Sequence, residues 1–129
     1  MRPGSRWLLV RMALLATPIV AACDFGPSGP GAFEAIVTGE ALGGVLLEVD
    51  GPGIRGFDAQ GDARVYWAAD PDRPGRHRVI VISPGGGELR FAIQVEDVGI
   101  ESPAMTVLQA TRADNRLTTP SAAVVRIVR

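Results

Sequence analysis

Residue types that serve as nucleophiles, bases and metal ligands are scarce in this sequence. Cys23 is the single cysteine and His77 the single histidine among 129 residues. A histidine base needs a nucleophile and an orienting acid beside it, and a zinc site needs several His or Cys ligands. No serine lies in a G-x-S-x-G turn. We therefore expect no enzyme activity and no cofactor or metal. Hydrolysis through His77, which we expect half-exposed at a strand start, is the least favoured alternative.

Asp70 and Asp72 form the carboxylate pair closest to a calcium-loop pattern. Calcium loops place several carboxylates and carbonyls at fixed spacing around a glycine turn. Here Arg73 and Arg76 follow at once and would compete for the carboxylates. A polar hairpin loop is therefore favoured, and calcium binding stays open as the alternative.

Residues 51–56 match the G-x-G-x-x-G motif of dinucleotide-binding proteins. That motif works only where a helix begins directly after it and points its N-terminus at the pyrophosphate. No helix is predicted after residue 56, and Pro52 removes a backbone donor. The segment is predicted to be a turn between two strands.

Tyr66 and Trp67 are the two candidate ligand-binding residues. Exposed aromatic rings stack on sugars or dock peptides. Neighbours on a strand point to opposite faces, so one ring is expected inside and the other partly exposed. Only 5% of the residues are aromatic. The favoured interpretation is therefore that Trp67 anchors the core and Tyr66 covers a sheet edge.

The first 22 residues have the pattern of a secretion signal. Three arginines precede a short apolar stretch at residues 12–20, and Ala21 and Ala22 follow it. This order of charge, apolar core and small residues is typical of a cleaved signal peptide. The apolar stretch is about half the length that a membrane-spanning helix needs.

The sequence Val20-Ala21-Ala22-Cys23 resembles the lipobox of bacterial lipoproteins. The resemblance implies that the Cys23 thiol receives a diacylglycerol, that the leader is cut before it, and that the new amino group is acylated. Two or more acyl chains anchor a protein stably to a membrane. Membrane lipid is thus the expected partner of Cys23. Asp24 leaves inner and outer membrane both open, and an ordinary signal peptide with a chance cysteine is the alternative.

The predicted mature chain is acidic and begins with a spacer. Without the three leader arginines, the net charge changes from −1 to −4, which argues against nucleic-acid binding. Residues 23–31 are rich in Gly and Pro and are expected to form a flexible tether. Residues 32–129 then form one domain.

Short apolar runs separated by Gly, Pro and Asp turns predict an all-β fold. We expect an immunoglobulin-like or cohesin-like antiparallel β-sandwich of about seven strands behind an N-terminal signal helix. The expected strands cover residues 32–38, 45–50 (with a short extension at 54–57), 63–68, 77–82, 88–96, 106–112 and 122–128. Residues 77–82 are apolar on both faces, as in a central strand, and residues 98–104 could hold one short helical turn.

Residues 43–98 resemble cohesin-type and carbohydrate-binding-module-type sandwiches of bacterial extracellular proteins. The resemblance rests on residues 44–49, 79–82 and 87–93, the last like the Gly-x-Leu strand that precedes a Phe-rich strand. It implies a sandwich fold and assigns no binding residue.

These features together predict a membrane-anchored lipoprotein on the extracytoplasmic side of the cell envelope. Its domain would be a non-catalytic module that binds a protein or a glycan. A structural lipoprotein that joins an envelope complex by strand addition at an open sheet edge is the alternative.

Overall fold

The structure is a computed structural model that describes residues 26–128. The predicted leader, the lipidation residue Cys23 and the first residues of the tether lie outside the described residues. Within residues 26–128, no helix has the length and apolar character that crossing a bilayer requires.

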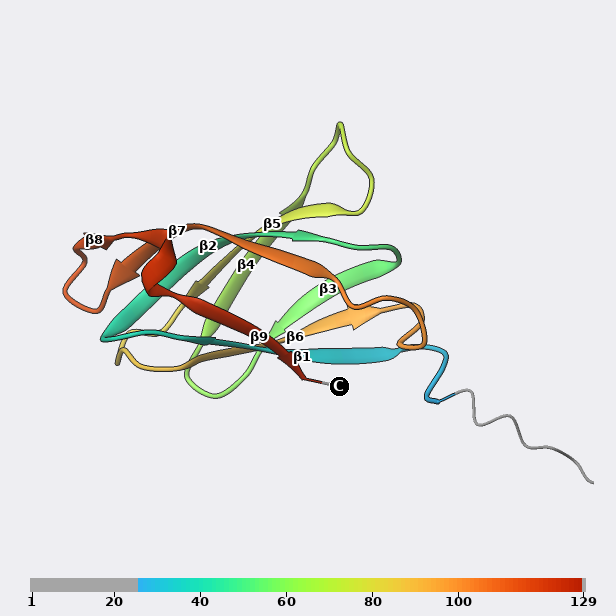
Figure 1. The fold of residues 1–129 in the computed structure, drawn as a ribbon, viewed down its shortest axis with the longest axis horizontal. Coiled ribbons are helices and arrows are strands. Elements are labelled where there is room, and N and C mark those ends of the chain that lie inside the picture. The colour runs from blue at the N-terminus through green and yellow to red at the C-terminus, as the bar shows by residue number, and fades with distance from the viewer. Residues whose placement is uncertain (1–25, 129) are drawn as a thin grey trace, which may run out of the picture.

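Two antiparallel sheets pack face to face, which confirms the predicted all-β sandwich (Figure 1). Sheet A contains, in spatial order, β3 (Ile54–Ala59), β6 (Leu89–Val95), β1 (Gly31–Thr38) and β9 (Val124–Val128). Sheet B contains β4 (Arg64–Ala69), β5 (Arg76–Ile82), β2 (Leu42–Asp50), β7 (Ala104–Arg112) and β8 (Leu117–Thr118). Most connections cross between the sheets, so strands adjacent in sequence face each other across the core.

Alternation of apolar and polar residues places the core between the two sheets. On β6, Leu89, Phe91, Ile93 and Val95 point inward and are at most 2% exposed. Burial of one such side chain stabilises a fold by roughly 1.5–3 kcal/mol. The largest fully buried rings are Phe33 and Phe91, which belong to neighbouring strands β1 and β6 of sheet A.

Strand β5 is an interior strand that is apolar on both faces, as its sequence predicts. Val79 and Val81 point into the core and are fully buried. Ile80 and Ile82 point to the outer face of sheet B, where they are 43% and 39% exposed. The two faces of the same strand therefore differ in whether anything covers them.

The predicted helical turn at residues 98–104 is wrong, and the last strand begins two residues later than expected. Residues 98–104 contain no helix; a hydrogen-bonded turn at residues 98–99 leads into β7. Asp97 holds this turn, because its carboxylate accepts hydrogen bonds from the N–H groups of Gly99 in the turn and of Gly29 before β1. Residues 120–122 form a short 3₁₀ helix (Pro120–Ala122) before β9 begins. Pro120 starts that turn, where its missing N–H does no harm.

The end of the expected tether lies against the domain. The Gly29 N–H donates to Asp97 Oδ1 over 2.9 Å, and the Val98 N–H donates to the Gly29 oxygen over 2.9 Å. Strand β1 then begins at Gly31, one residue before the expected domain boundary.

The sandwich has two ends that matter for function. Gly31 pairs with Val95, and Val128 pairs with Glu34, so the N-terminal segment and the end of β9 meet at one end. We call this the tether end; it also carries the turn at residues 51–53. The opposite end, the far end, carries the connections at residues 39–41, 83–88 and 113–116 (Figure 1).

Candidate functional site

His77 lies in the core, so the expectation of a half-exposed histidine is wrong. Only 6% of it is exposed, and its ring lies 5.5 Å from the Phe57 ring and 5.8 Å from the Trp67 ring. The strand period of two places His77 on the same inward face of β5 as Val79 and Val81. Its Nδ1 has no hydrogen-bond partner among the described residues. The one histidine is therefore closed off by aromatic side chains.

Tyr66 and Trp67 point to opposite faces of β4, as expected, but Trp67 is not the buried core anchor that the sequence predicts. Trp67 points inward and is still 44% exposed, because β4 is an edge strand of sheet B. It lies 5.5 Å from Phe57 and over Gly56, so it closes the gap between the edges of the two sheets instead of anchoring the core. Tyr66 is 56% exposed on the outer face of sheet B, beside Ile80.

The hairpin loop at residues 70–75 projects from the molecule and is held by its own charges (Figure 1). Asp70 accepts hydrogen bonds from the Asp72 N–H over 2.9 Å and from Arg76 Nε over 2.8 Å. These bonds, that from Asp72 foremost, lower the pKa of Asp70. The described residues hold no group of three or more His, Cys, Asp or Glu side chains arranged to bind a metal ion. As expected, Arg76 occupies the Asp70 carboxylate that a calcium ion would need.

Residues 51–53 form the turn between β2 and β3 that the sequence predicts. The Gly51 N–H donates to the Gly75 oxygen over 3.1 Å, which ties this turn to the hairpin loop. Gly53 has a φ of +67°, a conformation that side chains disfavour. Strand β3 follows at Ile54, so the segment has no helix N-terminus for a pyrophosphate.

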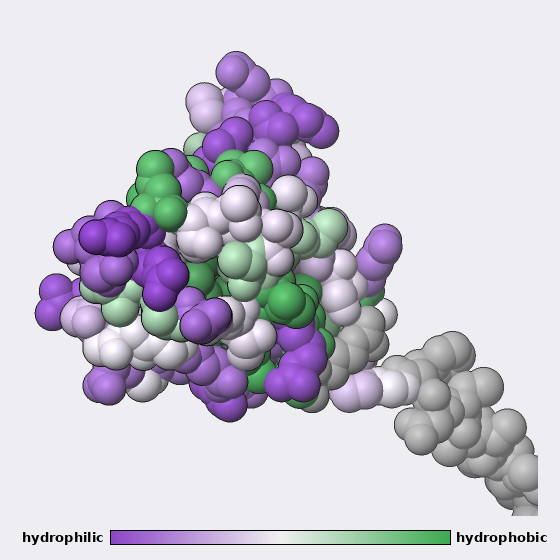
Figure 2. All heavy atoms as spheres, turned by 60° about the vertical axis from the view of Figure 1, so that its left-hand side comes forward, coloured by the Kyte–Doolittle hydropathy of each residue, from purple (hydrophilic) through white to green (hydrophobic). Residues whose placement is uncertain are grey.

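The outer face of sheet B carries an exposed apolar surface. Strand register places Tyr66, Ile80, Leu46 and Gln109 in one row across four strands, and Arg64, Ile82, Gly44 and Thr111 in the next. An antiparallel sheet usually presents polar residues on its solvent side. Figure 2 shows hydrophobic residues reaching the surface among hydrophilic ones. This face is the strongest candidate for a binding surface.

A trench runs along this face where β2 lacks side chains. Gly43 and Gly44 form its floor between β5 and β7. A Cβ atom on Gly43 would lie 2.7 Å from the Arg112 oxygen, and one on Gly44 would lie 3.2 Å from Thr111 Oγ1. The close approach of neighbouring strands thus requires glycine at Gly43 and favours it at Gly44.

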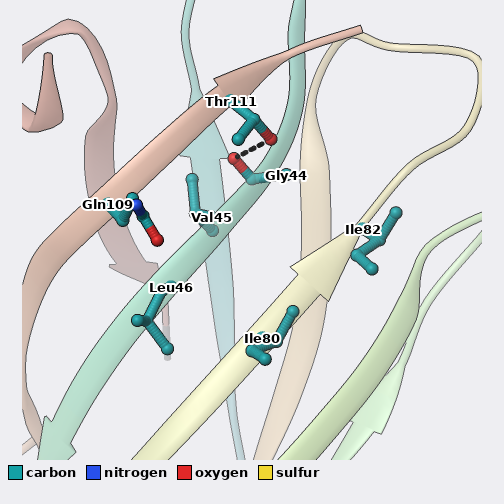
Figure 3. A pocket seen from close by; sticks show the side chains of 7 residues that line it. All are labelled: Gly44, Val45, Leu46, Ile80, Ile82, Gln109 and Thr111. Carbon is teal, nitrogen blue, oxygen red and sulfur yellow. Dashed lines mark hydrogen bonds between the residues drawn. The ribbon is translucent and has the colours of Figure 1, made fainter. Parts of the chain in front are cut away.

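The trench consists of two adjoining hollows that share Gly44, Ile82 and Thr111. The first, of about 180 Å³, has an aliphatic wall of Ile80 and Ile82 on β5 and a polar wall of Gln109 and Thr111 on β7 (Figure 3). The second, of about 400 Å³, reaches the far end, where it is lined by Ser83, Pro84, Arg112, Ala113 and Asn115.

Polar groups in and beside the trench remain available. Thr111 Oγ1 donates to the Gly44 oxygen over 3.3 Å, which leaves the Thr111 lone pairs free to accept (Figure 3). Among the described residues, Arg64 and Arg112 have no carboxylate partner within 4.0 Å. A ligand would therefore meet aliphatic side chains on the β5 side and hydrogen-bonding groups on the β7 side, with Arg64 beside the aliphatic wall and Arg112 beside the polar one.

Sequence reasoning finds one ring of this surface and misses the trench. The pair Gly43-Gly44 has the composition of a turn, and it lies instead inside β2. The sequence signal that could have indicated this surface is the strand at residues 77–82, which is apolar on both faces. In a fold of two sheets, only one face of such a strand is covered, so the other must be exposed.

Comparison with protein-family models, with curated proteins and with solved structures yields no match to this chain. The resemblance to cohesin-type sandwiches therefore stays a prediction.

Proposed function

We propose that this protein is an extracytoplasmic lipoprotein, anchored through Cys23, whose sandwich is a non-catalytic binding module. The trench on sheet B is its binding surface. The observation that carries the proposal is the row of Tyr66, Ile80 and Leu46 on a sheet face that nothing covers in the described chain. Contiguous apolar surface of this kind marks ligand and partner sites.

The position of the trench supports this role. Its floor at Gly43 and Gly44 lies near the far end, whereas the chain enters the domain at the tether end. A lipid on Cys23 would therefore hold the tether end toward the membrane and leave the mouth of the trench away from it.

An assembly lipoprotein remains the second candidate because sheet A has an open edge. Strand β9 is the outermost strand of sheet A, and Val124 on it is 63% exposed. Unpaired backbone groups on such a strand can accept a strand from another protein. The two candidates use different surfaces, so substitutions can separate them.

The test is retention of envelope components by the full-length lipoprotein in detergent. Wild type is compared with the double variant Ile80→Thr and Ile82→Thr, and with Val124→Thr as the matched control on β9. We expect a protein or glycan that wild type and the control both retain and that the double variant loses. Equal retention by all three would contradict the trench as the binding surface, and loss in Val124→Thr alone would favour strand addition.

A further inference from the structure

We propose that the trench binds an extended peptide segment of a partner protein in which aliphatic side chains stand next to an acidic group. This rests on the proposed function and names the chemistry of its ligand. The aliphatic side chains would lie against Ile80 and Ile82, and the acidic group would meet Arg64 and Arg112.

The aliphatic wall sets the first requirement. Ile80, Ile82 and Leu46 come from adjacent strands and surround the smaller hollow of about 180 Å³. Ligand sites are typically concave, mostly apolar and a few hundred Å³ in volume. Together the two hollows, of about 180 and 400 Å³, have a volume that suits a short peptide segment.

The polar wall sets the second requirement. Strands β2, β5 and β7 all have neighbours on both sides at this point, so their backbone groups already bond one another. A peptide cannot add here as a further strand; it must bond to side chains. The Gln109 amide and the Thr111 hydroxyl offer donors and acceptors for its backbone along one side of the trench.

The charges around the trench set the third requirement for the ligand. Toward the tether end of the same face, Arg76 and Arg78 are both paired with Glu48, at 3.7 and 3.4 Å. Toward the far end, Arg64 lies beside Ile82 on β4, and Arg112 lines the larger hollow. Within residues 26–128, no carboxylate lies within 4.0 Å of either arginine, although the predicted mature chain has a net charge of −4. An acidic group on the ligand would supply the missing partner.

Other occupants fit less well. A second copy that docked the same face would bring its own Arg64 and Arg112 to this surface, and like charges oppose such an interface. A glycan needs a platform of rings, and Tyr66 is the one aromatic residue on this face. A fatty acid needs an enclosed cavity, and the trench is open along its length.

The experiment selects binders from a display library of random seven-residue peptides on the full-length protein in detergent. We expect enrichment of peptides with two or more aliphatic residues beside Asp or Glu. One enriched peptide is then synthesised with a fluorescent label, together with twins that carry Gln or Lys in place of the acidic residue.

Binding of these peptides is measured by fluorescence anisotropy on wild type and on the double variant Arg64→Glu and Arg112→Glu. We expect the variant to bind the acidic peptide roughly tenfold more weakly and to prefer the Lys twin. Arg73→Glu, an unpaired arginine on the hairpin loop, is the matched control and should change the Kd by less than about twofold.

Each other outcome overturns the inference. Selected peptides without acidic residues, equal binding of the acidic peptide and its two twins, no enrichment, or self-association that Ile80→Thr abolishes would each do so. The proposed function is judged separately, because retention of an envelope component that depends on Ile80 and Ile82 does not require an acidic ligand.

Discussion

At the scale of single residues, His77 is the least expected feature of the core. A buried polar atom without a partner loses its bonds to water and gains nothing in return. Nδ1 of His77 is in that position among the described residues, between the rings of Phe57 and Trp67. The imidazole therefore contributes through packing, and its nitrogen works against stability.

Two substitutions at His77 separate the packing of the ring from the cost of its unpaired nitrogen. We expect His77→Phe to raise the free energy of unfolding by about 1 kcal/mol, because the unpaired nitrogen is removed and the ring is kept. We expect His77→Ala to lower it by about 2–4 kcal/mol, because a cavity remains. Urea denaturation of both variants gives the two values; a Phe variant less stable than wild type would show that the imidazole has a partner that it needs.

Trp67 and Tyr66 give a matched pair on neighbouring positions of β4. Trp67→Ala should lower the free energy of unfolding by about 2 kcal/mol, because the ring packs on Phe57 between the sheets. Tyr66→Ala should change it by less than about 0.5 kcal/mol, because the ring lies on the outer face. Thermal or urea unfolding measures both, and equal effects would contradict the assignment of the two rings to different faces.

The sequence predicts which face each of these rings occupies, and it cannot predict their exposure. The period of two is a local property of the chain, so it separates Tyr66 from Trp67. Exposure depends on which strand lies beside β4, and that neighbour is set by long-range pairing. For the same reason, His77 is placed correctly on a strand and wrongly at the surface.

At the scale of elements, the connection between β6 and β7 holds the N-terminal segment. The Gly99 N–H donates to Asp97 Oδ1 over 2.8 Å, and the Gly29 N–H donates to the same atom. These two bonds, that from Gly99 foremost, lower the pKa of Asp97. The carboxylate thus couples the last turn before β7 to the residues that precede β1.

This coupling should weaken in acid. Because the pKa of Asp97 is lower in the folded protein, its stabilising contribution is fully present above the pKa of an unfolded Asp, about 4. The contribution is lost as the pH falls through the lower folded value. The protection factors of the Gly29 and Gly99 amides, which are their NMR exchange rates relative to the intrinsic rates at the same pH, should therefore fall below about pH 4.

The variant Asp97→Ala should show low protection factors at both amides already at neutral pH, and these should no longer change near pH 4. Asp72→Ala, in the exposed hairpin loop, is the control and should leave both amides unchanged. Slow exchange at Gly29 in Asp97→Ala would contradict the role of the carboxylate.

Most strands are predictable from sequence because their apolar residues alternate, and β6 is the clearest case. The failures have particular causes. Gly43 and Gly44 look like a turn because composition alone does not reveal the strands β5 and β7 that approach them. The turn at residues 98–99 is held by Asp97, which also bonds to Gly29 far away in sequence, and no local pattern contains that second bond.

At the scale of the whole molecule, the chain enters the domain at the tether end, and the trench opens near the far end. This separation leaves the trench accessible, because a surface held against lipid would be closed to a partner. The trench itself could not be predicted from sequence, since it is made where β2, β5 and β7 meet.

The anchor is tested directly through Cys23. We expect wild-type protein to sediment with membranes and to have a mass increased by two or more acyl chains at residue 23. Cys23→Ser should remove the acylation and abolish membrane association, because no second anchor is proposed. Cell fractionation and mass spectrometry measure both, and membrane retention of the Ser variant would contradict the lipoprotein assignment.

The pairing of β1 with β9 has a consequence for the order in which the chain folds. Glu34 lies opposite Val128, so sheet A joins nearly the first and the last of the described residues. Contacts between residues so distant in sequence form slowly, because a long loop must close before they are made. Sheet A therefore cannot be completed until residues 124–128 have left the ribosome, so its outer strand β9 pairs only after the partner strand β1 has waited for most of the domain to be made.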